Sequence, residues 1–153
     1  MEKTINGLII VESPSKAKTL QKFLGDDYSI LASVGHIRDL PKNDLGVDLE
    51  NNFKANYIAS PDKSKVIKEL KSKVKDAKTI YIATDPDREG EAIGWHLIEI
   101  LKPKVPIKRL VFHEITKSAI QESFEHTREI DSSLVSAQEA RRILDRLWGY
   151  LVS

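Results

Sequence analysis

Three carboxylates at alternate positions, Asp85, Asp87 and Glu89, could bind a metal ion. They follow the apolar residues 80–83, a short run typical of a strand that is buried on both faces. Pro86 keeps Asp85 extended, because proline disfavours the helical region for the residue before it, and extended residues two apart point the same way. A helical pattern comes next, so the acids gather where a strand gives way to a helix. Open α/β folds bind their ligands at that end of the sheet.

The charge around these acids favours a bound cation. Residues 79–100 hold five acids and one base, whereas the whole chain balances at +1. Carboxylates pressed together repel unless a proton or a cation lies between them. A hard divalent ion such as Mg²⁺ is the simplest cation for such a cluster of oxygen ligands.

Two other interpretations fit part of the acidic motif. In one, Asp87 caps the helix, Glu89 and Glu91 complement its positive end, and Asp85 is a turn residue. This alternative stays open, although a cap needs one acid and not three. In the other, Asp85 begins an EF-hand loop. We reject it because the twelfth position is His96, where the loop requires a bidentate glutamate, and because a strand precedes the motif instead of a helix.

The length and composition indicate one domain of ordinary size, with 153 residues of which 41% are hydrophobic. There is no cysteine, which excludes disulfides and thiolate metal sites. The apolar residues 8–11 are too few for a signal peptide or a membrane span, so we expect a cytoplasmic protein without a membrane partner. A net charge near zero argues against nucleic-acid binding through bulk electrostatics but leaves room for local basic patches.

A second strand is predicted at residues 7–11, and it also ends in a carboxylate, Glu12. Ser13 and Pro14 then form a helix N-cap and first turn, and the helix runs to about residue 24. Lys16 stands in its first turn, where a cation opposes the helix dipole. A lysine at this position is better explained if it faces an anion such as phosphate. A solvated surface lysine is an equally open interpretation.

The middle of the chain is predicted to hold a strand at residues 28–34 and a polar turn at 35–41. In that turn His36 and Arg38 could reach a phosphate, although a lone histidine is more often structural. Residues 42–55 are expected to form a loop or a short hairpin. Residues 61–76 form a lysine-rich helix, and a solvated face explains its lysines better than a binding surface does.

The remaining segments complete an alternation of strands and helices. A strand is expected at residues 108–112, a helix from Thr116 to about residue 124, and a linker at 129–133. The last helix, residues 136–151, carries an apolar stripe with arginines beside it and looks like the start of a second domain. The order predicts an α/β fold, with a sheet of about four mainly parallel strands and helices on both faces.

The chain resembles the N-terminal part of the bacterial type IA DNA topoisomerase I family in five segments: VESPSKAKTL (11–20), SVGHIRDLP (33–41), ATDPDREGEAIGWHL (83–97), FHEITKSAI (112–120) and ARRILDRLWGYLVS (140–153). The resemblance implies a Toprim (Rossmann-like) domain over residues 1–130 and the first helix of a following, truncated domain over residues 131–153. The Glu-Ser-Pro-Ser-Lys run favours topoisomerase I over topoisomerase III. Reverse gyrase shares much of the pattern, but its helicase-like part should come before these segments.

The resemblance also implies the roles of individual residues. Asp85, Asp87 and Glu89 match the Mg²⁺ ligands, and Glu12 matches a further acid of that site, beside the scissile phosphate, that acts as general acid or base. Lys16, His36 and Arg141 match the other catalytic residues. The residues implied to contact DNA are Lys16, His36, Arg38, Arg141, Arg142 and Arg146.

The implied activity is Mg²⁺-dependent cleavage of one DNA strand by a tyrosine, strand passage and religation, which relaxes negatively supercoiled DNA. The family's tyrosine stands in a Tyr-Pro-Arg-Thr context that Tyr28, Tyr57, Tyr81 and Tyr150 lack. We therefore expect a fragment that is inactive alone. Its implied partners are a single-stranded segment of supercoiled DNA and the enzyme's other domains, and we expect a monomer associated with the nucleoid. The alternatives are a Toprim-type nuclease or primase and a nucleotide- or metal-binding regulatory module.

Overall fold

A sheet of four parallel strands forms the centre of the molecule in the computed structural model, which describes residues 7–40, 46–48, 54–55 and 57–152. The strands lie in the order β2-β1-β7-β8, and all three pairings are parallel. This confirms the predicted sheet. The strands are β1 (Gly7–Val11), β2 (Tyr28–Ala32), β7 (Ile80–Ile82) and β8 (Ile107–Arg109).

Helices cover both faces of this sheet. Because successive strand residues point to opposite faces, β1 contributes to two cores. Leu8 and Ile10 pack with residues of α2 and α3, whereas Ile9 and Val11 pack with residues of α1 and α4. The helices are α1 (Pro14–Leu24), α2 (Ser64–Asp76) after the 3₁₀ turn η1 (Pro61–Lys63), α3 (Arg88–Leu101), α4 (Lys117–Glu125) and α5 (Ser132–Val152).

The strand order creates one switch point. From β1 the chain crosses through α1 to β2 on one side, and from β7 it crosses through α3 to β8 on the other side. The carboxyl ends of β1 and β7 are therefore neighbours, with Ile10 opposite Ile82. Ligands of open α/β sheets bind in the crevice at such a point. Glu12 and Asp85, the acids that follow these two strands, are thereby brought close together.

Several elements differ from their predicted bounds, among them β2, which ends at Ala32 instead of residue 34. The strand β8 ends at Arg109 instead of residue 112, because its partner β7 ends at Ile82, the residue opposite Arg109. The main chain of Arg109 also pairs with that of Arg128, with N···O distances of 2.7 and 2.9 Å. Helix α5 begins at Ser132, four residues before the predicted start at residue 136. The reason is a side-chain cap, since Asp131 Oδ1 accepts from the amides of Ser133 and Leu134.

Short antiparallel pairs extend the region between β2 and α2. Part of the predicted polar turn is a strand, β3 (Arg38–Asp39), which pairs with β6 (Ile58–Ala59). The hairpin expected at residues 42–55 is present as β4 (Val47–Asp48) and β5 (Lys54–Ala55), and its residues 42–45 and 49–53 lie outside the described part of the chain.

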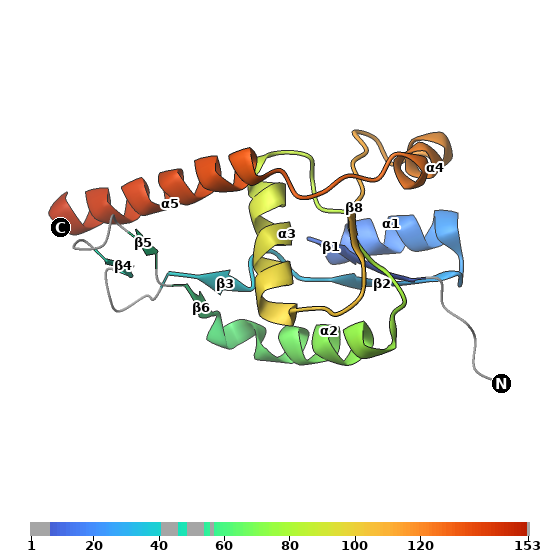
Figure 1. The fold of residues 1–153 in the computed structure, drawn as a ribbon, viewed down its shortest axis with the longest axis horizontal. Coiled ribbons are helices and arrows are strands. Elements are labelled where there is room, and N and C mark those ends of the chain that lie inside the picture. The colour runs from blue at the N-terminus through green and yellow to red at the C-terminus, as the bar shows by residue number, and fades with distance from the viewer. Residues whose placement is uncertain (1–6, 41–45, 49–53, 56, 153) are drawn as a thin grey trace.

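Helix α5 packs against α3, and the first turns of the two helices lie together (Figure 1). Its second half leaves Leu144, Trp148 and Leu151 exposed. Within the described ranges, no helix is both long enough and apolar enough to cross a membrane.

Candidate active site

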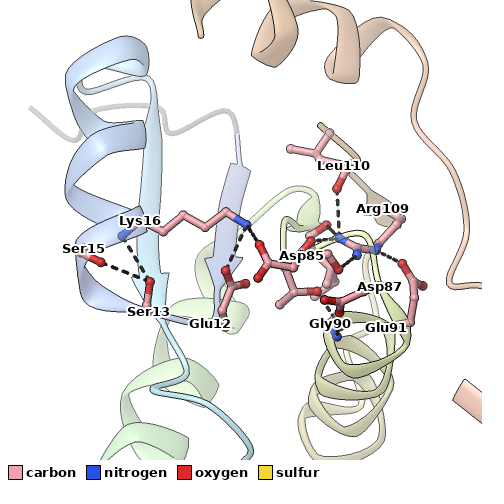
Figure 2. A network of polar contacts seen from close by, with 12 residues as sticks. Glu12, Ser13, Ser15, Lys16, Asp85, Asp87, Gly90, Glu91, Arg109 and Leu110 are labelled. Atoms are coloured by element: carbon pink, nitrogen blue, oxygen red, sulfur yellow. Dashed lines mark hydrogen bonds and ion pairs between the residues drawn. The ribbon is translucent and has the colours of Figure 1, made fainter. Parts of the chain in front are cut away.

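Lys16 lies between two carboxylates at the switch point. Its Nζ is 3.1 Å from Glu12 Oε1 and 3.2 Å from Asp85 Oδ1 (Figure 2). The Lys16 side chain is only 9% exposed, so the interpretation as a solvated surface lysine is wrong. The Ser13 hydroxyl accepts from the Lys16 amide and caps α1, which fixes where this side chain starts. Lys16 is therefore the cation that relieves the repulsion between Glu12 and Asp85.

The turn that carries the predicted metal ligands is held tightly to its own helix. Asp87 caps α3, with Oδ1 accepting from the Gly90 amide at 2.7 Å. The Thr84 hydroxyl donates to the Gly90 carbonyl at 2.6 Å. A Cβ on Gly90 would lie 1.9 Å from the Asp85 carbonyl oxygen, so only glycine allows this approach. Asp87 is thus a helix cap, as one interpretation of the sequence predicted. The carboxylates of Asp85 and Glu89 instead contact Lys16 and His36.

Arg109 organises the main chain beneath this turn. Its guanidinium donates to the carbonyl oxygens of Ile82, Thr84 and Asp85, at 3.0, 2.8 and 2.8 Å, and to that of Leu110 at 2.9 Å. The side chain is 1% exposed, and its Nε donates to Glu91 Oε1 at 2.6 Å. Sequence patterns alone did not identify this pair as part of the site. An arginine next to the apolar residues 110–112 was the available signal, because a charge in a buried strand needs a partner.

His36 lies on the other side of the acidic turn, with Nε2 3.7 Å from Glu89 Oε1. A distorted loop holds it there. Val34 has φ 57°, a left-handed conformation that is rare for a β-branched residue. The Gly35 amide donates to the Glu12 carbonyl at 2.8 Å, and Lys63 Nζ donates to the Val34 carbonyl at 2.7 Å. Strain of this kind is commonly found at functional sites.

A second polar cluster joins β3, α3 and α5 around a small cavity of about 50 Å³. The Arg38 guanidinium lies 5.0 Å from the ring centres of both Tyr57 and Trp95, and its Nε donates to His96 Nδ1 at 2.9 Å. Burial first, and then the nearby charges of Arg38 and His36, lower the pKa of His96 to about 3. Burial also raises the pKa of Tyr57. The cluster thus holds a neutral imidazole beside a permanent cation.

The same cluster contains a bidentate ion pair between Asp39 and Arg142. The two bonds, to Asp39 Oδ1 and Oδ2, are 3.0 and 2.9 Å long. Burial tends to raise the pKa of Asp39, but the hydrogen bonds from Arg142 and from the Leu40 amide, together with the charge of Arg142, hold that pKa below its usual value. The pair links α5 to β3 across 103 residues of sequence.

The structure thus divides the predicted site residues into groups. Glu12, Lys16 and Asp85 are in direct contact, and the turn brings Asp87 and Glu89 next to them, with His36 against Glu89. Arg38 and Arg142 belong instead to the second cluster, engaged with protein groups. Arg141 and Arg146 lie on α5, where Arg141 is exposed.

The acids fit a metal ion by their chemistry more than by their present arrangement. In the described part of the chain, no three acidic or histidine side chains are grouped as metal ligands. The Asp85 and Glu89 side chains are 61% and 65% exposed, so both can change rotamer. Glu12 Oε2 is buried and has no hydrogen-bond partner among the residues that the structure describes. A buried carboxylate oxygen without a partner is costly, and a cation or a proton would satisfy it.

Comparisons with known proteins agree with the fold and the motifs. The Toprim domain family matches residues 7–115, and the chain belongs to this family. It is 52% identical to DNA topoisomerase 1 of Synechococcus elongatus over 160 residues, covering 95% of this chain and 18% of that protein. It is also 52% identical to DNA topoisomerase 1 of Mycolicibacterium smegmatis over 163 residues, covering 97% of this chain and 17% of that protein.

A solved structure, full-length topoisomerase I from Thermotoga maritima, is similar with a TM-score of 0.85 and 48% identity, over 92% of this chain and 24% of that one. The predicted resemblance is confirmed. Toprim domains of topoisomerases bind a metal. The chain spans less than a fifth of the length of the two curated relatives.

Proposed function

We propose that this chain is the N-terminal, metal-binding part of a bacterial type IA DNA topoisomerase, which relaxes negatively supercoiled DNA. The supporting observation is the Glu12–Lys16–Asp85 cluster at the switch point of a Toprim fold. It places an acid with an unpaired oxygen, a buried cation and an acidic turn at one point. Such a site can bind a phosphodiester and transfer a proton.

Asp85, Asp87 and Glu89 would hold Mg²⁺, with Glu12 as a further ligand. The donors are carboxylate oxygens, which suit this ion, and the unpaired Oε2 of Glu12 is available to it. When bound, Mg²⁺ supplies positive charge that neutralises a phosphate and orients the DNA. Coordination by Asp85 would compete with its present ion pair to Lys16.

The protein's own residues would carry the remaining roles. Glu12 holds a proton for the 3′-oxygen of the cleaved strand and takes it back on religation. Lys16 would stabilise the charge of the scissile phosphate. Its Nζ is the cation of the site and lies between Glu12 and Asp85. Arg141, exposed on α5, provides a second cation, and His36 contacts the DNA near Glu89.

Arg38, Arg142 and Arg146 would extend the DNA contact along α5 and β3. The Arg142 side chain remains 35% exposed in its pair with Asp39. A phosphate could therefore compete with Asp39 for its guanidinium, which binds both anions in the same bidentate way.

We further propose that residues 1–130 form the Toprim domain and that residues 131–153 begin a following domain. The start of α5 at Ser132 supports this boundary. The nucleophilic tyrosine would lie in another domain of the same enzyme. A monomeric state and a location in the cytoplasm at the nucleoid remain predictions.

A chimeric enzyme tests the proposal. The segment of the Mycolicibacterium smegmatis topoisomerase that aligns with this chain is replaced by residues 1–153, which the 52% identity makes feasible. The chimera should relax negatively supercoiled plasmid in the presence of Mg²⁺. The same chimera carrying Glu12→Gln or Asp85→Asn should lose most of this activity. A folded chimera that is inert, while the parent enzyme is active, would refute the proposed function.

The nuclease and primase alternatives are tested with the chain alone. A nuclease would convert plasmid to nicked circles or fragments that no enzyme reseals, and a primase would make short oligonucleotides on a single-stranded template. Both reactions should be absent. If either appears and depends on Asp85 and Asp87, the topoisomerase assignment must be replaced.

A further inference from the structure

Glu91 is a buried acid whose two oxygens serve two different parts of the molecule. It lies in the first turn of α3 and is 3% exposed. Its Oε1 accepts from Arg109 Nε at 2.6 Å (Figure 2), and its Oε2 accepts from the main-chain amide of Asp131 at 2.9 Å. A carboxylate that only balanced the charge of Arg109 would not need the second contact.

Through Arg109, Glu91 is connected to the turn that carries the proposed metal ligands. The guanidinium that Glu91 binds also donates to the carbonyl oxygens of Ile82, Thr84 and Asp85. Ile82 is the last residue of β7, Thr84 follows the strand, and Asp85 is the residue whose side chain would contact the metal. A shift of Glu91 would therefore move Arg109 and, with it, the main chain at Asp85.

Through Asp131, the same carboxylate is connected to α5. The Asp131 side chain caps that helix, with Oδ1 bonded to the amides of Ser133 and Leu134 at 3.0 and 3.3 Å. The residue before it is also pressed against α3, since a Cβ on Gly94 would lie 2.9 Å from Ile130 Cδ1. The start of α5 is thus set by two neighbouring contacts with α3, and Glu91 supplies the polar one.

We propose that Glu91 is a positioning residue that couples metal binding at the acidic turn to the docking of α5. The inference rests on the proposed metal site of Asp85, Asp87 and Glu89. A bound metal would further restrict the turn and, through it, Arg109 and Glu91, and the amide of Asp131 would be held with them. The coupling is reciprocal, so a docked α5 also favours the metal-binding form of the turn. The helix that carries Arg141 and Arg142 is then ordered together with the metal site.

Amide hydrogen exchange in the wild-type chain tests this coupling without any mutation. Mg²⁺ should slow exchange at Asp131 and in the first turn of α5 about fivefold or more. The protection should rise with the same Mg²⁺ dependence as protection of the acidic turn. Exchange in α4, which has none of these contacts, should stay unchanged.

Glu91→Gln tests whether Glu91 couples the metal site to α5 or only supports the fold. Glutamine has an acceptor oxygen at only one of the two positions, and its NH2 group would face the other donor, so it can serve Arg109 or the Asp131 amide but not both. The variant should bind Mg²⁺ about fivefold or more weakly and lose the Mg²⁺-dependent protection of α5. The matched control is Glu99→Gln, which removes the same charge from an exposed position of the same helix. It should behave as wild type.

A second pair of variants tests the contact from the α5 side, in case Glu91→Gln does not fold. Asp131→Pro removes the amide that Glu91 accepts from, whereas Asp131→Ala removes the side-chain cap and keeps that amide. Protection of Leu134 and Val135 by Mg²⁺ should be lost in the proline variant and kept in the alanine variant.

The outcomes distinguish this inference from the proposed function. If wild type binds Mg²⁺ without any change of exchange at Asp131, the coupling is refuted and the metal site stands. The coupling is also refuted if the folded Glu91→Gln variant keeps wild-type affinity and protection. If wild type does not bind Mg²⁺ at all, the proposed metal role falls, and this inference falls with it.

Discussion

At the residue scale, Lys16 neutralises two carboxylates that a metal ion would also use. Its buried ammonium contacts Glu12 and Asp85. In Lys16→Gln these acids lose their counterion, so the metal-free chain should lose about 1–3 kcal/mol of stability. The affinity for Mg²⁺ should rise, because the competing cation is gone, while the affinity for DNA falls.

Titration calorimetry with Mg²⁺ measures the first effect of Lys16→Gln, and urea unfolding measures the stability. Lys18→Gln, which removes an exposed lysine from the same helix, is the matched control and should change neither quantity much. Weaker Mg²⁺ binding by Lys16→Gln would show that Lys16 supports the metal site instead of competing with it.

His96 makes the stability of the protein depend on pH. Its pKa is lowered from 6.5 to about 3, first by burial and then by the charges of Arg38 and His36. Because the unfolded chain binds the proton at a higher pH than the folded chain does, stability is full above pH 6.5 and falls as the pH drops from there toward 3. The slope approaches about 1.4 kcal/mol per pH unit.

Urea unfolding between pH 5 and pH 7.5 measures this slope. In His96→Asn the side-chain oxygen can accept from Arg38 in place of Nδ1, and the titrating group is gone. The variant should therefore show a flatter pH dependence over the same range. Equal slopes for the two proteins would contradict the assignment of this effect to His96.

At the element scale, the contact between the start of α3 and the end of β7 depends on Gly90. In Gly90→Ala the new Cβ would lie 1.9 Å from the Asp85 carbonyl, so the helix must move away from the strand. We expect a loss of about 3 kcal/mol or more and weaker Mg²⁺ binding. Denaturant unfolding and calorimetry measure the two effects.

Gly149→Ala in α5 is the matched control for Gly90→Ala, because a Cβ there would meet no atom within 4 Å. Alanine is a better helix former than glycine, so this variant should gain about 0.5–1 kcal/mol. The two changes are chemically identical and should have opposite signs. A similar loss of stability in both variants would mean that the effect of Gly90→Ala does not come from the close approach to Asp85.

At the scale of the whole molecule, the net charge of +1 limits how the chain binds DNA. The proposed contacts, namely Lys16, Arg38, Arg141, Arg142 and Arg146, would neutralise about 3–5 phosphates. The logarithm of the binding constant for a single strand should fall with the logarithm of salt concentration with a slope of about −2 to −3.5. Fluorescence anisotropy with a labelled oligonucleotide measures this slope. Tight binding that persists in high salt would contradict a site built from these few cations.

The chain alone should not relax supercoiled plasmid. The described tyrosine side chains have other surroundings, since Tyr28 and Tyr81 pack with Phe124, and Tyr57 lies against Arg38 and His96. None of the chain's tyrosines has the sequence context of the family's nucleophile. A plasmid relaxation assay with Mg²⁺ checks this, and relaxation by the pure chain would refute the assignment of the nucleophile to another domain.

The sequence by itself determined the four strands of the central sheet, the main helices and the acidic motif, whereas the short strands β3 and β6 were not predicted. Their signals are local: apolar runs mark β1 and β7, and side-chain caps at Ser13, Asp87 and Thr116 mark where helices begin. A local signal depends on neighbours within about one helical turn, which is why it can be followed along the chain. The alternation of these elements was also enough to predict a parallel sheet with helices on both faces.

Only the tertiary structure decided which side chains meet. Lys16 contacts Asp85 across 69 residues, and Arg142 contacts Asp39 across 103. Arg109 and Glu91, which hold the acidic turn in place, were not recognised before the fold was known. These partners depend on the order β2-β1-β7-β8 and on how α5 packs on α3. An alternation of strands and helices is compatible with several strand orders, and each order brings different carboxyl ends together. The contacts that define the site are therefore set by packing between distant segments, which local sequence patterns do not specify.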